Sequence, residues 1–128
     1  MADTAYVVDG GLGYVTGLML AAGATEANHI GWGIGTTAAT VTDTDLESES
    51  VETRTEGTST QQTTTTTDDT YRVVGTIVDT VAIKEITEVA LFTAVTSGTM
   101  LMRATFSAIN VSIDDSIQFT INNVLNQA

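Results

Sequence analysis

The stretch AIKEITEVALFTAVTSGTMLMRATFSA, residues 82–108, decides the fold. Its first half places apolar side chains on both faces of an extended segment at residues 89–92, and residues 96–98 (TSG) predict a turn. In its second half, apolar side chains recur with period two at Met100, Met102, Ala104 and Phe106. Period two indicates a half-buried strand, and a short connection that contains Gly indicates a hairpin. The stretch therefore predicts a β-hairpin, and no catalytic motif lies inside it.

Four strands are predicted in the second half of the chain, over residues 71–78, 86–94, 99–107 and 116–124. They follow one another closely, which favours an antiparallel meander. The apolar positions change parity near Ser107, and this change predicts a β-bulge or a bend.

The N-terminal part is expected to form an arm and one short helix. Residues 1–11 are predicted to be the arm, as an ordered segment or a short strand with an apolar set at Tyr6, Val7 and Val8, ended by Asp-Gly-Gly. From residue 12 to residue 22, apolar residues recur at spacings of three and four, which predicts an amphipathic helix.

A glycine-rich strand and a polar segment follow. In HIGWGIG, residues 29–35, apolar residues alternate with Gly, so one face of the predicted strand has no side chains. A bare face allows another backbone or a large ring to approach closely. Residues 36–50 are expected to form a polar loop, with one helical turn at residues 45–49.

Residues 51–69 are low in complexity and nearly devoid of apolar side chains. Residues 51–56 are compatible with a solvated edge strand, and residues 56–69 are expected to form a flexible Thr-rich loop. Two interpretations of the threonine run stay open. It is either a disordered tip or an arm that orders by pairing with the sheet edge of a neighbour through Thr63, Thr64 and Thr65.

Taken together, these patterns predict a mainly β protein formed by one domain, residues 1–128. The expected architecture is an antiparallel β-sandwich or a barrel-like sheet of about six strands, with one short N-terminal helix. The 26 threonines support this prediction, since β-branched residues favour strands.

Composition and charge exclude several classes of function. The net charge of -12 repels phosphate backbones, so neither nucleic acid nor an anionic membrane surface is an expected partner. The absence of Cys excludes disulfides and thiolate-bound metals. No secretory signal is predicted, and the apolar segment at residues 15–24 is too short to span a bilayer. The protein is expected to be made in a cytoplasm.

No candidate catalytic or metal site has the required pattern. His29 has no nucleophile or acid near it in a suitable context. Four acidic residues spaced by two could gather around a cation, but they fail the calcium-loop pattern, so a solvated acidic loop is the preferred interpretation. These four residues are Asp43, Asp45, Glu47 and Glu49.

Two other acidic pairs also favour structural roles. Asp114 and Asp115 predict a turn rather than a metal site. Glu85 and Glu88 are three residues apart on a strand and point to opposite faces, so they do not form a glycosidase pair. Cross-strand pairing with Lys84 and Arg103 explains them more simply. No enzymatic activity and no cofactor are expected.

Four pieces occur in an order that resembles small virion structural proteins of tailed bacteriophages. They are HIGWGIGTT (29–37), DLESE (45–49), ITEVALF (86–92) and MLMRATF (100–106). The usual pattern of that group runs from a Gly-rich strand through a Leu-Glu-x-Glu loop to an I-T-E-x-G/A-L-F strand and an R-x-x-F strand. Here Ala90 replaces a frequent Gly, and the insertion at 56–69 lies outside the pattern.

Within that group the chain is most similar to capsid decoration, or cement, proteins. The resemblance implies a homotrimer on the outer surface of the virion that bridges neighbouring capsomers of the major capsid protein and stabilises the shell. The contacts expected for this role are Tyr6, Val7 and Val8 in the arm and Thr63, Thr64 and Thr65 in the loop. The alternative is a tail, baseplate or tail-fibre component.

Overall fold

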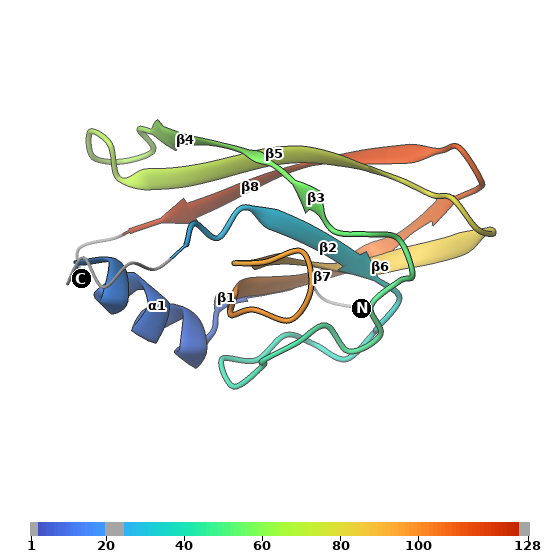
Figure 1. Ribbon diagram of the computed structural model, residues 1–128, viewed down its shortest axis with the longest axis horizontal. Helices are drawn as coiled ribbons and strands as arrows, with labels where there is room; N and C mark the ends of the chain where they lie inside the picture. The colour runs from blue at the N-terminus through green and yellow to red at the C-terminus, as the bar shows by residue number, and fades with distance from the viewer. Residues whose placement is uncertain (1–2, 20–24, 126–128) are drawn as a thin grey trace.

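The stretch at residues 82–108 folds as the predicted hairpin, with strands β6 (Lys84–Phe92) and β7 (Met100–Val111) inside a five-stranded sheet (Figure 1). The computed structural model describes residues 3–19 and 25–125. Ala104 faces Val89 and Met102 faces Leu91 across the hairpin. The register shifts between Ile86 and Glu88, opposite the β7 segment that contains Ser107, so the predicted bulge is confirmed.

Two antiparallel sheets pack face to face as a β-sandwich, with one helix at one end (Figure 1). The remaining elements are β1 (Thr4–Val7), α1 (Asp9–Met19), β2 (His29–Gly33), β3 (Thr55–Glu56), β4 (Thr58–Gln62), β5 (Thr70–Val78) and β8 (Ser116–Val124). The five-stranded sheet has the order β1-β7-β6-β2-β3, and the three-stranded sheet has the order β4-β5-β8. The predicted mainly β class is confirmed, with eight strands in place of about six.

The predicted meander is wrong. β5 pairs with β4 and β8, whereas β6 pairs with β2 and β7. The connections at residues 79–83 and 112–115 therefore cross from one sheet to the other. Alternation of side chains shows which face of a strand is buried but not which strand lies beside it, so sequence order was a poor guide to pairing.

The main core lies between the two sheets. Trp32 on β2 packs edge-on against Phe119 on β8, with ring centroids 6.4 Å apart. A second cluster lies elsewhere, on the outer face of the five-stranded sheet, and consists of Val8, Leu46, Ala90, Phe92 and Met100. Because this sheet is buried on both faces, β6 carries apolar side chains on both sides.

The helix begins at Asp9, three residues before the predicted start at Leu12. The predicted end of the first strand before Asp-Gly-Gly is confirmed, but these three residues belong to the helix, and Gly11 allows α1 to approach β7. A Cβ on Gly11 would collide with the carbonyl oxygen of Leu101. The predicted helix end at residue 22 lies outside the described residues. Within the described residues, no helix has the length and apolar character that a membrane span requires.

The Thr-rich segment at residues 56–69 contains regular structure, because residues 58–62 form β4, and the loop is confined to residues 63–69. β4 pairs with β5 over five residues, from Thr58 opposite Val74 to Gln62 opposite Thr70. The carboxylate of Asp69 then accepts hydrogen bonds at 2.8–2.9 Å from the backbone N–H groups of the loop, which are those of Thr64, Thr65 and Thr66. This carboxylate replaces the backbone partners that the loop lacks.

Candidate interaction surface

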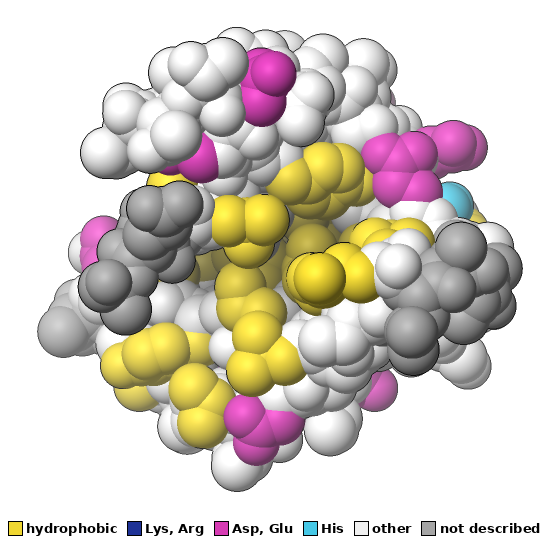
Figure 2. Space-filling view, turned by 90° about the vertical axis from the view of Figure 1, so that its left-hand side faces the viewer, with side chains coloured by type: hydrophobic (Ala, Val, Ile, Leu, Met, Phe, Trp, Pro, Cys, Tyr) yellow, Lys and Arg dark blue, Asp and Glu magenta, His cyan; other side chains and the backbone are white. Residues whose placement is uncertain are grey.

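An apolar groove of about 570 Å³ opens at the end of the sandwich where α1 and β1 meet the ends of β5 and β8. Figure 2 shows yellow apolar side chains lining this hollow. The side chains that line the groove are those of Val7, Leu12, Tyr14, Val15, Leu18, Glu26, Tyr71, Leu101, Asn123, Val124 and Leu125.

Several apolar side chains of the groove are exposed to solvent. Leu12 and Leu18 on α1 are 57% and 45% exposed, and Leu125 after β8 is 67% exposed. Tyr14 and Val15 of the helix pack against the main core, and Leu12 and Leu18 lie on the same side of α1 and line the groove beside them. A contiguous apolar hollow of this kind marks a surface that binds a ligand or a partner.

The polar boundary of the groove is acidic. The Tyr71 hydroxyl lies 3.0 Å from Glu26 Oε1 and 3.0 Å from the carbonyl oxygen of Ala27. Burial, together with the Glu26 carboxylate, raises the pKa of Tyr71 above its usual range, so the phenol stays neutral. Figure 2 shows magenta carboxylates around the hollow, and none of the described side chains visible on this face is basic.

The Thr-rich loop lies beside the groove. A smaller hollow next to it is lined by Gln61, Asp68, Asp69 and Thr70, and it shares Tyr71 and Leu125 with the groove. The two predicted contact segments, far apart in the sequence, thus lie at one end of the molecule.

The structure separates the predicted contact residues into accessible and inaccessible ones. Tyr6 and Val7 on β1 are 46% and 36% exposed. The side chains of Thr63, Thr64 and Thr65 are also exposed. Val8 is only 1% exposed because it belongs to the second apolar cluster, so its side chain is not accessible on the surface of the chain. Sequence reasoning missed the helical residues Leu12 and Leu18, since the amphipathic pattern was assigned only to packing.

No basic side chain is exposed, whereas eleven of the sixteen carboxylates are. Arg54 and Arg103 are buried, and Arg72 and Lys84 are partly buried. The exposed charge of the described side chains is therefore acidic, and most of the positive charge lies in three internal ion-pair clusters.

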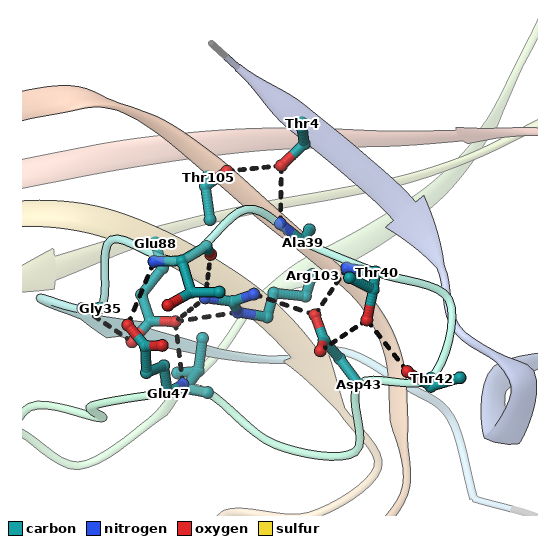
Figure 3. A network of polar contacts seen from close by, with 12 residues as sticks. Thr4, Gly35, Ala39, Thr40, Thr42, Asp43, Glu47, Glu88, Arg103 and Thr105 are labelled. Carbon is teal, nitrogen blue, oxygen red and sulfur yellow. Dashed lines mark hydrogen bonds and ion pairs between the residues drawn. The ribbon is translucent and has the colours of Figure 1, made fainter. Parts of the chain in front are cut away.

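The first cluster fastens the loop after β2 to the outer face of the five-stranded sheet (Figure 3). Arg103 lies between two carboxylates, with Nη2 at 2.8 Å from Glu88 Oε2 and Nη1 at 2.9 Å from Asp43 Oδ2. Glu88 is fully buried, and its carboxylate also accepts backbone N–H groups of the loop, those of Gly35, Glu47 and Ser48. Its buried charge is therefore compensated by a cation and by three N–H donors.

The second cluster fastens the end of the same loop to the β6–β7 turn. Arg54 pairs with Glu49 at 2.8 Å and donates to the carbonyl oxygens of Ala94 and Ser97. Its guanidinium carbon lies 3.4 Å from the ring centroid of Phe92. A cation over an aromatic face gains electrostatic attraction, so this arginine covers the second apolar cluster.

The third cluster surrounds Lys84. Its Nζ lies 2.5 Å from Glu52 Oε1 and 3.1 Å from Asp79 Oδ1. Burial alone would lower the pKa of Lys84, but hydrogen bonds to both carboxylates raise it above its usual value. The indole N–H of Trp32 also donates to Glu52, at 3.2 Å.

The acidic loop is held by ion pairs at two positions, while Asp45, Glu47 and Glu49 are exposed, as predicted for a solvated loop. Asp43 pairs with Arg103, and Glu49 pairs with Arg54. The predicted helical turn at residues 45–49 does not form. Among the described side chains, no group of three metal-ligating residues comes together.

The bare face predicted for residues 29–35 is confirmed, and the acidic loop packs against it. A Cβ on Gly33 would meet the carbonyl oxygen of Ser48 and a carboxylate oxygen of Glu88. A Cβ on Gly31 would lie 2.9 Å from a carboxylate oxygen of Glu49. The glycines at every second position of this strand therefore leave room for the loop that carries the acidic residues 43–49.

The other predicted site residues have structural roles. His29 is the first residue of β2 and pairs with Phe92. The predicted turn at residues 114–115 is confirmed, with Asp114 at a φ of 74°. Glu88 pairs with Arg103 as predicted, whereas Lys84 pairs with Glu52 and Asp79.

Comparisons with known proteins identify no relative of this chain. No protein-family model, no curated protein and no solved structure gives a significant match. The function of the chain must therefore be inferred from its own residues.

Proposed function

We propose that this protein is a non-enzymatic structural component of a tailed bacteriophage, which decorates the outside of the capsid and stabilises it by bridging capsomers. The observation that carries the proposal is the apolar groove with an acidic boundary at one end of the β-sandwich, whose loops are held by internal ion pairs. The resemblance of its sequence motifs to those of decoration proteins supplies the biological setting. In that setting the protein is made in the host bacterial cytoplasm and ends on the outer surface of the virion.

The chemistry of the groove defines the partner segment. Leu12, Leu18 and Leu125 offer apolar surface, and burial of one such side chain contributes about 1.5–3 kcal/mol. The carboxylates around the groove, with no visible basic residue between them, favour a partner whose apolar side chains are flanked by Lys or Arg. In the proposed function this partner is a surface of the major capsid protein.

The three ion-pair clusters support a role as a rigid binding protein rather than one that changes conformation. Arg103 and Arg54 fix the long loop after β2 to the sheet and to the β6–β7 turn. Little rearrangement is therefore needed when the groove meets its partner, and a rigid binding surface loses less conformational entropy on association.

The acidic exterior fits a position outside the shell. A surface with eleven exposed carboxylates and no exposed basic residue repels packaged nucleic acid. A homotrimer would add apolar burial to this chain, and the mass of the isolated protein in solution measures that state directly.

The test is binding to empty heads that lack the protein. The wild-type chain should sediment with the heads and raise the temperature at which they rupture. Leu12→Asp and Leu18→Asp should abolish both effects, because a carboxylate in the groove opposes burial. Ile113→Asp is the matched control, since Ile113 is 53% exposed in the turn before β8, and the groove lies at the other end of that strand.

Two results would overturn the proposal. One is a wild-type chain that neither binds heads nor shifts their rupture temperature. The other is electron microscopy of labelled virions that places the chain on the tail or baseplate, which favours the tail component instead.

A further inference from the structure

Lys84 is the only lysine of the chain, and it lies against two carboxylates in a dry site between the ends of the strands. It begins β6, whereas Asp79 follows β5, and Glu52 precedes β3. The Lys84, Glu52 and Asp79 side chains are 13%, 3% and 0% exposed. Lys84 Nζ lies 3.1 Å from Asp79 Oδ1, so the nitrogen is held next to the carboxyl group, and positioning of this kind lowers the entropic cost of a reaction between the two groups.

The two oxygens of Asp79 differ in their surroundings. Oδ1 accepts a hydrogen bond from the backbone N–H of Val81 at 3.1 Å and also contacts Lys84 Nζ. Oδ2 is buried and has no hydrogen-bond partner, a situation shared by only one other side-chain atom in the described part of the chain. A buried oxygen without a partner costs free energy, which a reaction that expels this oxygen would recover.

We propose that Lys84 and Asp79 become joined by an intramolecular amide bond, formed once by the folded chain itself, with Glu52 as the proton carrier. This inference is independent of the proposed function.

The step balances without any further reactant. Glu52, whose Oε1 lies 2.5 Å from Nζ, first carries a proton from the Lys84 ammonium to Asp79 Oδ2, which leaves a neutral amine and a neutral carboxylic acid. The Nζ lone pair attacks Asp79 Cγ, and a C–N bond forms. Glu52 takes the second proton from nitrogen and delivers it to the Oδ2 hydroxyl. The C–Oδ2 bond then breaks, one water leaves, and Glu52 is again a carboxylate.

The surrounding groups are placed for these roles. Oδ1, which stays as the amide oxygen, is polarised by the Val81 N–H where negative charge develops. Glu52 is oriented by the Trp32 indole and by the backbone N–H of Thr80. The ion pair is the starting state, so proton transfer from Lys84 must precede attack.

The intact mass of the purified, denatured chain tests the proposal. The bond removes one water, so the wild-type mass should fall about 18 Da below the mass of the sequence. Trypsin should then fail to cleave after Lys84, because that side chain is acylated. The joined peptide, residues 73–103, should give no backbone fragments between residues 79 and 84, since a single break there leaves the ring connected.

Two variants assign the roles. Lys84→Arg keeps the positive charge but cannot form this amide, and it should show the full mass. Glu52→Gln keeps the shape of the proton carrier but removes its basicity, and it should also show the full mass. A wild-type chain of full mass that trypsin cleaves after Lys84 overturns the proposal, whether or not the variants fold.

Loss of water at another site in the chain can be distinguished from the Lys84–Asp79 cross-link. The Asp9-Gly10 sequence can lose water by forming a succinimide. A mass loss that persists in Lys84→Arg would place the reaction there and overturn the proposal. A Glu52→Gln chain that forms the cross-link as quickly as the wild type would overturn the role of Glu52.

Discussion

The Arg103 guanidinium and the Glu88 carboxylate lie 2.8 Å apart on neighbouring strands, and both are shut off from solvent, with residue exposures of 2% and 0%. Desolvation of two charges is costly, and their attraction offsets that cost only while both are present. The pair holds the loop after β2, and through this loop it covers the second apolar cluster.

Replacement of Arg103 by Met should therefore destabilise the protein strongly. We expect a loss of about 3–5 kcal/mol in the free energy of unfolding, because Glu88 would be left as an uncompensated buried charge. Urea denaturation followed by circular dichroism measures the change. Arg72→Met is the control, since Arg72 contacts only Asn122 at the surface and should change stability by less than about 1 kcal/mol. Equal effects of the two substitutions would contradict the buried-pair account.

Asp43 should make stability depend on acidic pH. Burial opposes its ionisation, but hydrogen bonds from Thr40 and Arg103 outweigh it and lower the pKa of Asp43. A carboxylate with a lowered folded-state pKa stabilises the fold above its unfolded pKa, and this contribution is lost as pH falls through the folded value. The stability difference between the wild type and Asp43→Asn should thus be largest near pH 7 and shrink below about pH 4. A difference that grows on acidification would have the wrong sign.

Two glycines should respond in opposite ways to replacement by Ala. Gly33→Ala should destabilise the fold by about 1–3 kcal/mol, because its Cβ would collide with the carbonyl oxygen of Ser48. Gly13→Ala should stabilise it by up to about 1 kcal/mol, since Gly13 lies in α1 with no atom within 4 Å of the added Cβ. Thermal unfolding of both variants checks the signs, and a neutral Gly33→Ala would show that the loop is not packed against β2.

Asp69 should control the order of the Thr-rich loop. In Asp69→Ala, the backbone N–H groups of Thr64, Thr65 and Thr66 lose their acceptor, and their hydrogen exchange should accelerate. The neighbouring Asp68→Asn is the matched control, because Asn tolerates the positive φ of 61° at that position. Unchanged exchange in the Asp69 variant would mean that the turn is held by other contacts.

Local patterns predicted the strands well, because the alternation of apolar and polar side chains that marks a strand can be seen within its own residues. The β6–β7 hairpin, the bulge near Ser107 and β8 all follow from alternation. The division into two sheets could not be predicted, since it depends on which strands meet across long connections. The start of α1 was misplaced because Gly11 was assigned to the end of the arm, whereas it lies in the helix and its missing Cβ allows packing against Leu101.

The Glu88–Arg103 pair was predicted, but the other contacts of the ion-pair clusters were missed although their components were visible in the sequence. Glycines spaced by two at residues 31–35 and acids spaced by two at residues 43–49 match as a bare face and a covering loop. Four basic residues in a chain with sixteen acids also indicate that each cation has a specific place. The exposed groove depends on how α1 sits against the sandwich, which no local pattern encodes.

The inward placement of the basic residues has a consequence for how many copies behave together. Each molecule carries a net negative charge on its surface, so two copies that meet at random repel each other at low ionic strength. Two copies could not offset this repulsion by pairing a basic side chain of one copy with a carboxylate of the other, because none of the four Lys and Arg side chains is fully exposed. Copies could then touch only through faces that carry few carboxylates. The distribution of charge alone would therefore limit the relative orientations of neighbouring copies bound to one surface.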